Sequence, residues 1–183
     1  MLKDDIKKVL ISEAELDSKI REIGAKISKD YAGKEPLVVG LLKGVIPFLG
    51  DLIKTIDCYC EVDFLRVRSY EGTSSTGNVS TSGYIPDVKG KDIILVDDIL
   101  DTGNTLKKIK NLFLNAGAKS VKVCVLLDKP EGRKVDIYAD YFCFEVPNEF
   151  VVGYGLDFNQ KYRNLPYVGV LKEEVYKRWL YAR

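Results

Sequence analysis

The chain has 183 residues, of which 46% are hydrophobic and 30% charged, with a formal net charge of +1. This length suits a single domain, residues 1–183, and the composition is that of an ordinary soluble globular protein. The near-zero charge argues against a strongly electrostatic nucleic-acid-binding protein, and the absence of histidine excludes Ser-His-Asp and Cys-His catalysis.

The sequence shows no sign of a membrane or secreted protein. Every hydrophobic run falls short of the roughly 20 residues that cross a bilayer. The segment Met1–Asp5 lacks the basic-then-hydrophobic order of a signal peptide. We therefore expect a cytoplasmic protein without a membrane partner. Its cysteines form no Cys-x-x-Cys pair and are expected to be free, reduced thiols: Cys58, Cys60, Cys124 and Cys143.

The first third of the chain predicts alternating helices and strands. Hydrophobic residues recur near the helical period in residues 4–30, which predicts a helix with Ser12 as an internal cap. The elements that follow are a strand over 37–42, a turn at Lys43 and Gly44, a helix over 45–54 and a strand over 59–67.

A long polar loop comes next. Ten of the thirteen residues from 71 to 83 are Gly, Ser or Thr. Loops of this length in a compact domain are either functional or disordered. We therefore expect a mobile loop over about 69–83 that is either functional or disordered.

The most informative segment runs from Ile93 to Leu106. Its first four residues, 93–96, are hydrophobic and predict a strand buried on both faces, and Asp97 and Asp98 follow at the carboxyl end. Carboxylates beside a hydrophobic strand are costly to bury alone, so they indicate a polyhydroxylated or metal-bound ligand. The stretch Thr102–Thr105 offers backbone N–H groups and hydroxyls at a helix N-terminus, where phosphate binds readily.

The rest of the chain continues the alternation of helices and strands. The predicted elements are helices over 105–116 and 173–181 and strands over 121–127, 141–145 and 150–153. This order predicts an α/β fold with a central, mostly parallel twisted sheet flanked by helices. In such sheets the ligand binds at the carboxyl ends of the strands, where the 42–44 turn, the 97–105 loop and the segment after Leu127 should meet.

The segment Ile93–Leu106 resembles the phosphoribosyl-diphosphate motif of the type I phosphoribosyltransferases. The resemblance implies that family's fold, with a small hood from segments near the termini. It implies that Asp97 and Asp98 accept hydrogen bonds from the ribose hydroxyls. The loop that would wrap the 5′-phosphate consists of Thr102, Gly103, Asn104 and Thr105. Taken alone, the same run also fits a strand, a turn and a capped helix with solvated acids.

Three further features resemble the 6-oxopurine branch of that family. Lys43 and Gly44 would hold the diphosphate through backbone N–H groups, often with a cis peptide; the alternative is a plain turn. Asp101 would be the catalytic residue that takes the N7 proton of the purine while N9 attacks the anomeric carbon; the alternative is a helix-capping acid. Lys129 would donate to the O6 atom of the base; the alternative is a solvated lysine before Pro130.

The segment 144–157 resembles the purine-binding end of the same branch. Phe150 would stack on the base and the backbone of Val151 would read the purine edge, whereas both could instead be strand core. Arg163 would contact the diphosphate, although a solvated surface arginine is the alternative. The magnesium ligands that the resemblance implies are Asp157, Asp97 and Asp98.

Ser69 and Tyr70 open the polar loop and resemble a pair on the family's closing loop, which excludes water from the reacting centre. A loop without a role is the alternative. One departure from the family concerns the acidic pair. The purine-salvage enzymes often carry Glu-Asp where this chain has Asp97 and Asp98, and the shorter side chain makes the resemblance weaker at Asp97 than at Asp98.

The resemblance predicts a purine-salvage enzyme that uses Mg²⁺ and transfers ribose 5-phosphate from phosphoribosyl diphosphate to N9 of hypoxanthine or guanine. It also implies a homodimer or homotetramer without a nucleic-acid partner. The alternatives are a xanthine-preferring enzyme, a non-catalytic nucleotide-binding regulatory protein on the same fold, and an interaction domain that has lost its chemistry.

Overall fold

A six-stranded sheet forms the centre of the computed structural model, which describes residues 2–68, 80–81 and 84–180. Its strand order is β4-β3-β2-β5-β6-β7; five strands run parallel, and β4 pairs antiparallel with the end of β3. The strands are β2 (Leu37–Leu42), β3 (Glu61–Arg68), β4 (Ser80–Thr81), β5 (Asp92–Leu100), β6 (Ser120–Asp128) and β7 (Tyr141–Glu145). The predicted mostly parallel sheet is confirmed.

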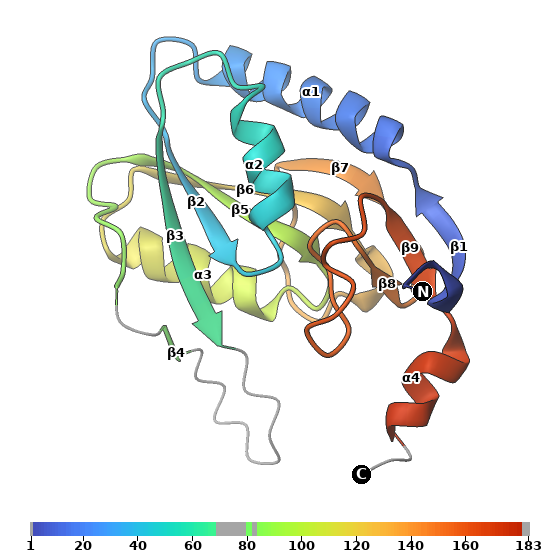
Figure 1. Ribbon diagram of the computed structural model, residues 1–183. Coiled ribbons are helices and arrows are strands. Elements are labelled where there is room, and N and C mark those ends of the chain that lie inside the picture. The colour runs from blue at the N-terminus through green and yellow to red at the C-terminus, as the bar shows by residue number, and fades with distance from the viewer. Residues whose placement is uncertain (1, 69–79, 82–83, 181–183) are drawn as a thin grey trace.

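Helices cover both faces of this sheet (Figure 1). Helices α1 (Glu13–Asp30) and α2 (Ile46–Ile53) lie on one face, and α3 (Asn104–Asn115) lies on the other. Consecutive strand residues point to opposite faces, so Ile94 packs in the core under α1 and α2, whereas Leu95 packs under α3. This two-sided burial is the reason that the inner strands are continuous hydrophobic runs.

A second, three-stranded sheet forms a hood from segments near both ends of the chain. Its order is β1-β9-β8, with antiparallel pairing throughout. The hood and its neighbouring elements are η1 (Leu2–Asp5), β1 (Ile6–Ile11), β8 (Val151–Val152), β9 (Val168–Leu171) and α4 (Glu173–Leu180). The hood was predicted, but strand β9 was not.

The predicted helix over 4–30 is wrong in its first part. Residues Ile6–Ile11 form a strand because they pair with Val168–Leu171, a partner that the local sequence does not reveal. Helix α1 begins only after Ser12, which is its N-cap and forms a capping box with Glu15 rather than lying inside the helix. All four cysteines are free, as expected.

The sheet reverses its direction of winding between β2 and β5. The chain passes from β2 through α2 to β3 on one side, and from β5 through α3 to β6 on the other. Pairing between β2 and β5 ends at Gly40 and Val96, although β5 continues to Leu100. The two strands therefore part at their carboxyl ends, which is where ligands bind in sheets of this kind.

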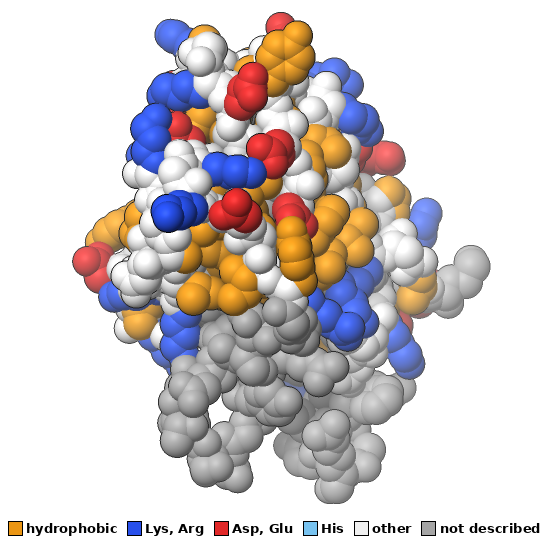
Figure 2. All heavy atoms as spheres, turned by 90° about the vertical axis from the view of Figure 1, so that its left-hand side faces the viewer, with side chains coloured by type: hydrophobic (Ala, Val, Ile, Leu, Met, Phe, Trp, Pro, Cys, Tyr) orange, Lys and Arg blue, Asp and Glu red, His pale blue; other side chains and the backbone are white. Residues whose placement is uncertain are grey.

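The β3 side of the sheet carries exposed hydrophobic side chains among charged ones (Figure 2). Val62 and Phe64 of β3 are about two-fifths exposed because this strand lies near the edge of the sheet, where α2 covers it incompletely. Within the described part of the chain, no helix has the length and hydrophobicity that crossing a bilayer requires.

Candidate active site

A cleft of about 200 Å³ opens where β2 and β5 part. It is lined by Leu41, Leu42, Lys43, Gly44, Val67, Asp97, Asp98, Thr105, Asp157 and Arg163. Seven of these ten are residues that the sequence singled out. The cleft brings together the turn after β2, the end of β5, the start of α3 and a hood loop, segments that lie far apart along the chain.

Glycines allow these segments to approach closely. A Cβ atom at Gly44 would lie 1.7 Å from Asp98 Oδ2, and a Cβ atom at Gly155 would lie 1.9 Å from the carbonyl oxygen of Gly44. Gly155 also has a φ of 100°, a left-handed value that favours glycine. The peptide between Leu42 and Lys43 is cis. The turn after β2 is thus packed between the acidic end of β5 and the hood.

Asp97 and Asp98 lie inside β5 rather than after it, because pairing with β6 continues to Leu100. The backbone N–H of Asp98 donates to Asp97 Oδ1 at 3.0 Å. Burial raises the pKa of Asp97 well above its ordinary range, and the charge of Asp98 raises it further. Burial also raises the pKa of Asp98, while hydrogen bonds to Asp97 and the charge of Arg163 act in the opposite direction. Such a pair favours a ligand that brings hydroxyl donors or positive charge.

Asp101 and Lys129 meet beside the ends of β5 and β6. Lys129 Nζ lies 3.7 Å from Asp101 Oδ2, and the Lys129 side chain is only 12% exposed, so it is not a solvated surface lysine. The capping alternative for Asp101 is wrong, because the N-cap of α3 is Gly103 and receives no side-chain cap. The structure therefore places a carboxylate and an ammonium group together, where the 97–105 loop and the segment after Leu127 were expected to meet.

The predicted phosphate loop leads into α3. Gly103 has a φ of 81° at the N-cap, Asn104 is the first residue of the helix, and Thr105 lines the cleft. Thr102 accepts a hydrogen bond from the backbone of Lys134 through its carbonyl oxygen at 3.0 Å. This arrangement leaves the N-terminus of α3 facing the cleft, where the helix dipole favours an anion.

Asp157 and Arg163 approach the cleft from the hood. Arg163 forms an ion pair with Asp157 Oδ1 at 2.6 Å and donates to the carbonyl oxygen of Gly155 at 2.7 Å. Gln160 receives hydrogen bonds from Arg163 at 3.2 Å and from Lys43 Nζ at 3.5 Å. The expected metal ligand and the expected diphosphate contact are thus paired with each other, rather than being separate surface side chains.

Two of the remaining predicted residues lie in or beside the hood, and the other two lie outside the described residues. Phe150 is 43% exposed and meets Phe158 edge-to-face with ring centroids 5.6 Å apart, so it is not strand core. Val151 is buried in β8 and pairs with Val170 of β9. Ser69 and Tyr70 lie outside the described residues.

Comparison with known proteins agrees with this geometry. The model of the phosphoribosyl transferase domain family matches residues 12–159. The chain belongs to the phosphoribosyltransferase family. The hypoxanthine-guanine phosphoribosyltransferase of Streptococcus pneumoniae is 55% identical over 178 residues, which cover 96% of this chain and 99% of that protein. The corresponding protein of Streptococcus agalactiae is 54% identical and covers 97% and 100%.

Solved structures of this family also resemble the chain. A hypoxanthine phosphoribosyltransferase from Staphylococcus aureus superposes with a TM-score of 0.92 at 46% identity, covering 96% of each chain. The hypoxanthine phosphoribosyltransferase of Trypanosoma cruzi gives the same TM-score at 32% identity, covering 97% of each chain. The fold and the enzyme class of a phosphoribosyltransferase are therefore established for this chain.

Some residues that shape this phosphoribosyltransferase site were missed in the sequence. Arg133 contacts four acceptors around the Asp101 loop. Gly132 packs against the carboxylate of Asp101, since a Cβ atom there would lie 1.8 Å from Oδ1. Both occur in a Pro-Glu-Gly-Arg stretch that reads as an exposed polar turn. Gly155 lay within the segment 144–157 that resembles the purine-binding end. The available signal for its role was a glycine placed between a tyrosine and a leucine.

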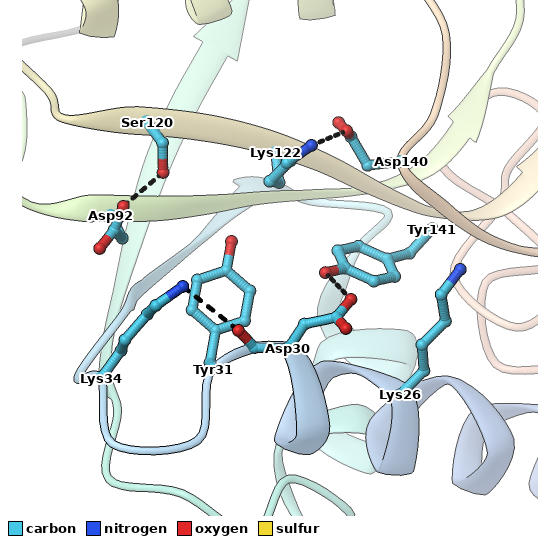
Figure 3. Close-up of a pocket in the computed structure, with 9 residues that line it drawn as sticks. All are labelled: Lys26, Asp30, Tyr31, Lys34, Asp92, Ser120, Lys122, Asp140 and Tyr141. Atoms are coloured by element: carbon cyan, nitrogen blue, oxygen red, sulfur yellow. Dashed lines mark hydrogen bonds and ion pairs between the residues drawn. The ribbon is translucent and has the colours of Figure 1, made fainter.

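A larger hollow, of about 480 Å³, lies at the opposite end of the sheet (Figure 3). It is bounded by the end of α1 and the starts of β5, β6 and β7. Many of its polar groups are paired with one another: Ser120 donates to Asp92 at 2.6 Å, and Tyr141 donates to Asp30 at 2.8 Å. None of the predicted site residues lines it. We therefore assign the phosphoribosyltransferase site to the smaller cleft.

Proposed function

We propose that this chain transfers the 5-phosphoribosyl group from phosphoribosyl diphosphate to N9 of hypoxanthine or guanine. The products are IMP or GMP and diphosphate. The observation that carries this proposal is the Lys129 side chain, which is 12% exposed and places its ammonium group 3.7 Å from the Asp101 carboxylate, next to a cleft lined by Asp97 and Asp98. An ammonium donor beside a carboxylate acceptor is complementary to the O6 and N7–H edge of a 6-oxopurine.

The cleft would hold the sugar and its phosphates. Asp97 and Asp98 accept hydrogen bonds from the ribose 2′- and 3′-hydroxyls. The backbone of Lys43 and Gly44 and the guanidinium group of Arg163 bind the diphosphate. The 5′-phosphate lies in the loop of Thr102, Gly103, Asn104 and Thr105 at the N-terminus of α3.

The purine base would lie among Lys129, Asp101, Phe150 and Val151. Lys129 donates to O6, and the exposed ring of Phe150 stacks on the base. Asp101 takes the proton from N7 while the N9 lone pair attacks C1′ and the bond from C1′ to the diphosphate oxygen breaks. The backbone of Val151 reads the purine edge, and Ser69 and Tyr70, which lie outside the described residues, contribute to substrate binding.

Magnesium fits the donor set of the cleft. Asp97, Asp98 and Asp157 offer the oxygen ligands that Mg²⁺ prefers. In the described residues, no three potential ligands lie close enough to form a complete protein site. This agrees with the usual binding of Mg²⁺ through one or two carboxylates together with substrate oxygens and water. When bound, the ion would neutralise charge on the diphosphate leaving group. We expect activity to be lost on chelation with EDTA and restored by added Mg²⁺.

The proposal includes a cytoplasmic enzyme that assembles as a homodimer or homotetramer and binds no nucleic acid. Family resemblance and the near-neutral charge support these points. Sedimentation equilibrium measures the assembly, and a monomer at micromolar concentration would contradict it. Filter binding with RNA at two salt concentrations tests the regulatory alternative, because a true RNA complex weakens with salt.

A spectrophotometric assay tests the function directly. Hypoxanthine, guanine, xanthine and adenine are each supplied with phosphoribosyl diphosphate and Mg²⁺. We expect turnover of hypoxanthine or guanine and far slower turnover of adenine. Asp101→Asn should lower kcat by about two to four powers of ten, the usual contribution of a general base, and leave binding of phosphoribosyl diphosphate nearly unchanged. Near-normal turnover by Asp101→Asn would refute the role of Asp101.

A further inference from the structure

Arg133 joins the two strand ends that carry Asp101 and Lys129. Its Nε donates to the carbonyl oxygen of Asp101 at 3.0 Å, and its Nη2 donates to the carbonyl oxygen of Leu100 at 3.2 Å. The same Nη2 forms an ion pair with Asp128 at the end of β6. Its Nη1 donates to the carbonyl oxygen of Ile137. One guanidinium group thus connects the end of β5, the end of β6 and the following loop.

This side chain is built into the protein rather than resting on its surface. The Arg133 side chain is 14% exposed and that of Asp128 is 18% exposed. Its methylene stem lies against Gly103, where an added Cβ atom would come within 3.0 Å of Arg133 Cδ. The guanidinium therefore fixes the backbone immediately before the predicted phosphate loop, and its stem fixes that loop's left-handed glycine.

Arg133 contacts Asp101 through the backbone of that residue and not through its carboxylate. Arg133 holds the carbonyl oxygen of Asp101 and leaves the carboxylate facing Lys129. The turn η2 (Pro130–Gly132) carries Lys129 at its N-cap and Arg133 at its C-cap, so the base-recognising lysine and this arginine flank one short turn. A change at Arg133 would alter the position of the carboxylate without removing any group that touches the substrates.

We propose that Arg133 is a positioning residue, which sets the location of the Asp101 carboxylate relative to Lys129 by holding the backbone of residues 100–103. This inference rests on the proposed function. Lysine cannot replace arginine here, because a single ammonium group cannot reach all four acceptors that surround the planar guanidinium group. Arg133→Lys keeps the charge beside Asp128 and so avoids leaving that carboxylate unpaired.

A double-mutant cycle tests the proposal. Wild type, Arg133→Lys, Asp101→Asn and the double variant are assayed with hypoxanthine and phosphoribosyl diphosphate. If Arg133 acts through the Asp101 carboxylate, Arg133→Lys should lower kcat about tenfold in the wild-type background, and by less than about twofold once Asp101→Asn has removed that carboxylate. The KM for phosphoribosyl diphosphate should change by less than about twofold.

The controls separate this role from a purely structural one. Arg21 makes a comparable two-bond ion pair with Asp17 on the exposed face of α1, and Arg21→Ala should leave kcat unchanged. Equal losses from Arg133→Lys in both Asp101 backgrounds would overturn the proposal, as would a normal kcat. Failure of the wild type to turn over hypoxanthine would instead refute the proposed function. Retained activity in Asp101→Asn would refute the role of Asp101 and, with it, the positioning role of Arg133.

A second variant covers the case in which Arg133→Lys does not fold. Asp128→Asn removes the charged anchor of the guanidinium but leaves its carbonyl acceptors on Leu100, Asp101 and Ile137. Asp128→Asn should lower kcat by less than Arg133→Lys does. This loss should likewise shrink once Asp101→Asn has removed the carboxylate. A loss that is independent of Asp101 in this variant would also overturn the proposal. Circular dichroism and the midpoint of thermal unfolding establish that each variant is folded.

Discussion

Gly132→Ala is a small substitution that should displace the proposed catalytic carboxylate without unfolding the protein. The added Cβ atom would lie 1.8 Å from Asp101 Oδ1, whereas real Cβ contacts are essentially never shorter than 3.0 Å. The carboxylate must therefore move by about 1.2 Å or more. Its side chain is 42% exposed and can turn outward into solvent, so the main consequence is a misplaced base rather than a strained core.

The expected magnitude follows from that displacement. A misplacement of about 1 Å in a reacting group can cost about a hundredfold in rate, so kcat for hypoxanthine should fall by about that factor. The KM for phosphoribosyl diphosphate should remain close to the wild-type value, because the three atoms nearest the new methyl group all belong to Asp101 rather than to Asp97, Asp98 or the turn at Gly44. The midpoint of thermal unfolding should change by less than about 2 °C.

Gly50→Ala is the matched control. Gly50 lies in α2 at an exposed position, and a Cβ atom there meets nothing within 4 Å. Alanine should leave kcat unchanged and stabilise the helix by about 0.5–1 kcal/mol. Steady-state kinetics and thermal unfolding are measured on both variants. A folded Gly132→Ala protein with wild-type kcat would refute the placement of Asp101 at the reacting base.

Further predictions concern the acidic pair, the hood and base selection. Because burial raises the pKa of Asp97 above the ordinary 3.8, the folded state favours its protonated form, and this stabilisation is present at low pH and lost as the pH rises through the raised pKa. Asp97→Asn should therefore raise the midpoint of thermal unfolding of the ligand-free protein at pH 7, by a margin that shrinks toward pH 4; a constant margin would contradict the cause given. Gly155→Ala places a Cβ atom 1.9 Å from the Gly44 carbonyl oxygen at a φ of 100°, so it should destabilise the protein by about 2 kcal/mol or more and raise the KM for phosphoribosyl diphosphate. Lys129→Met should lower kcat/KM for hypoxanthine about a hundredfold and narrow its advantage over adenine; an unchanged ratio of the two bases would exclude Lys129 from reading O6.

The local sequence was sufficient for the centre of the fold and for much of the cleft. Hydrophobic runs such as Leu37–Leu42 identify buried parallel strands, because both faces of these strands are covered. The acids that follow Ile93–Val96 stand out because carboxylates rarely border such a run. Their position in the chain order of strands and helices predicted that Asp97, Asp98 and the turn at Gly44 would meet, which the structure shows.

Only the tertiary structure decided the features that depend on distant partners. Residues Ile6–Ile11 have helix-like spacing, yet they form a strand because Val168–Leu171 supplies the pairing edge. Arg133 lies in a stretch that resembles a solvated turn, yet the ends of β5 and β6 surround its guanidinium with acceptors. Periodicity and composition record which face of a segment is buried, whereas hydrogen-bond partners far along the chain are set by how the segments pack.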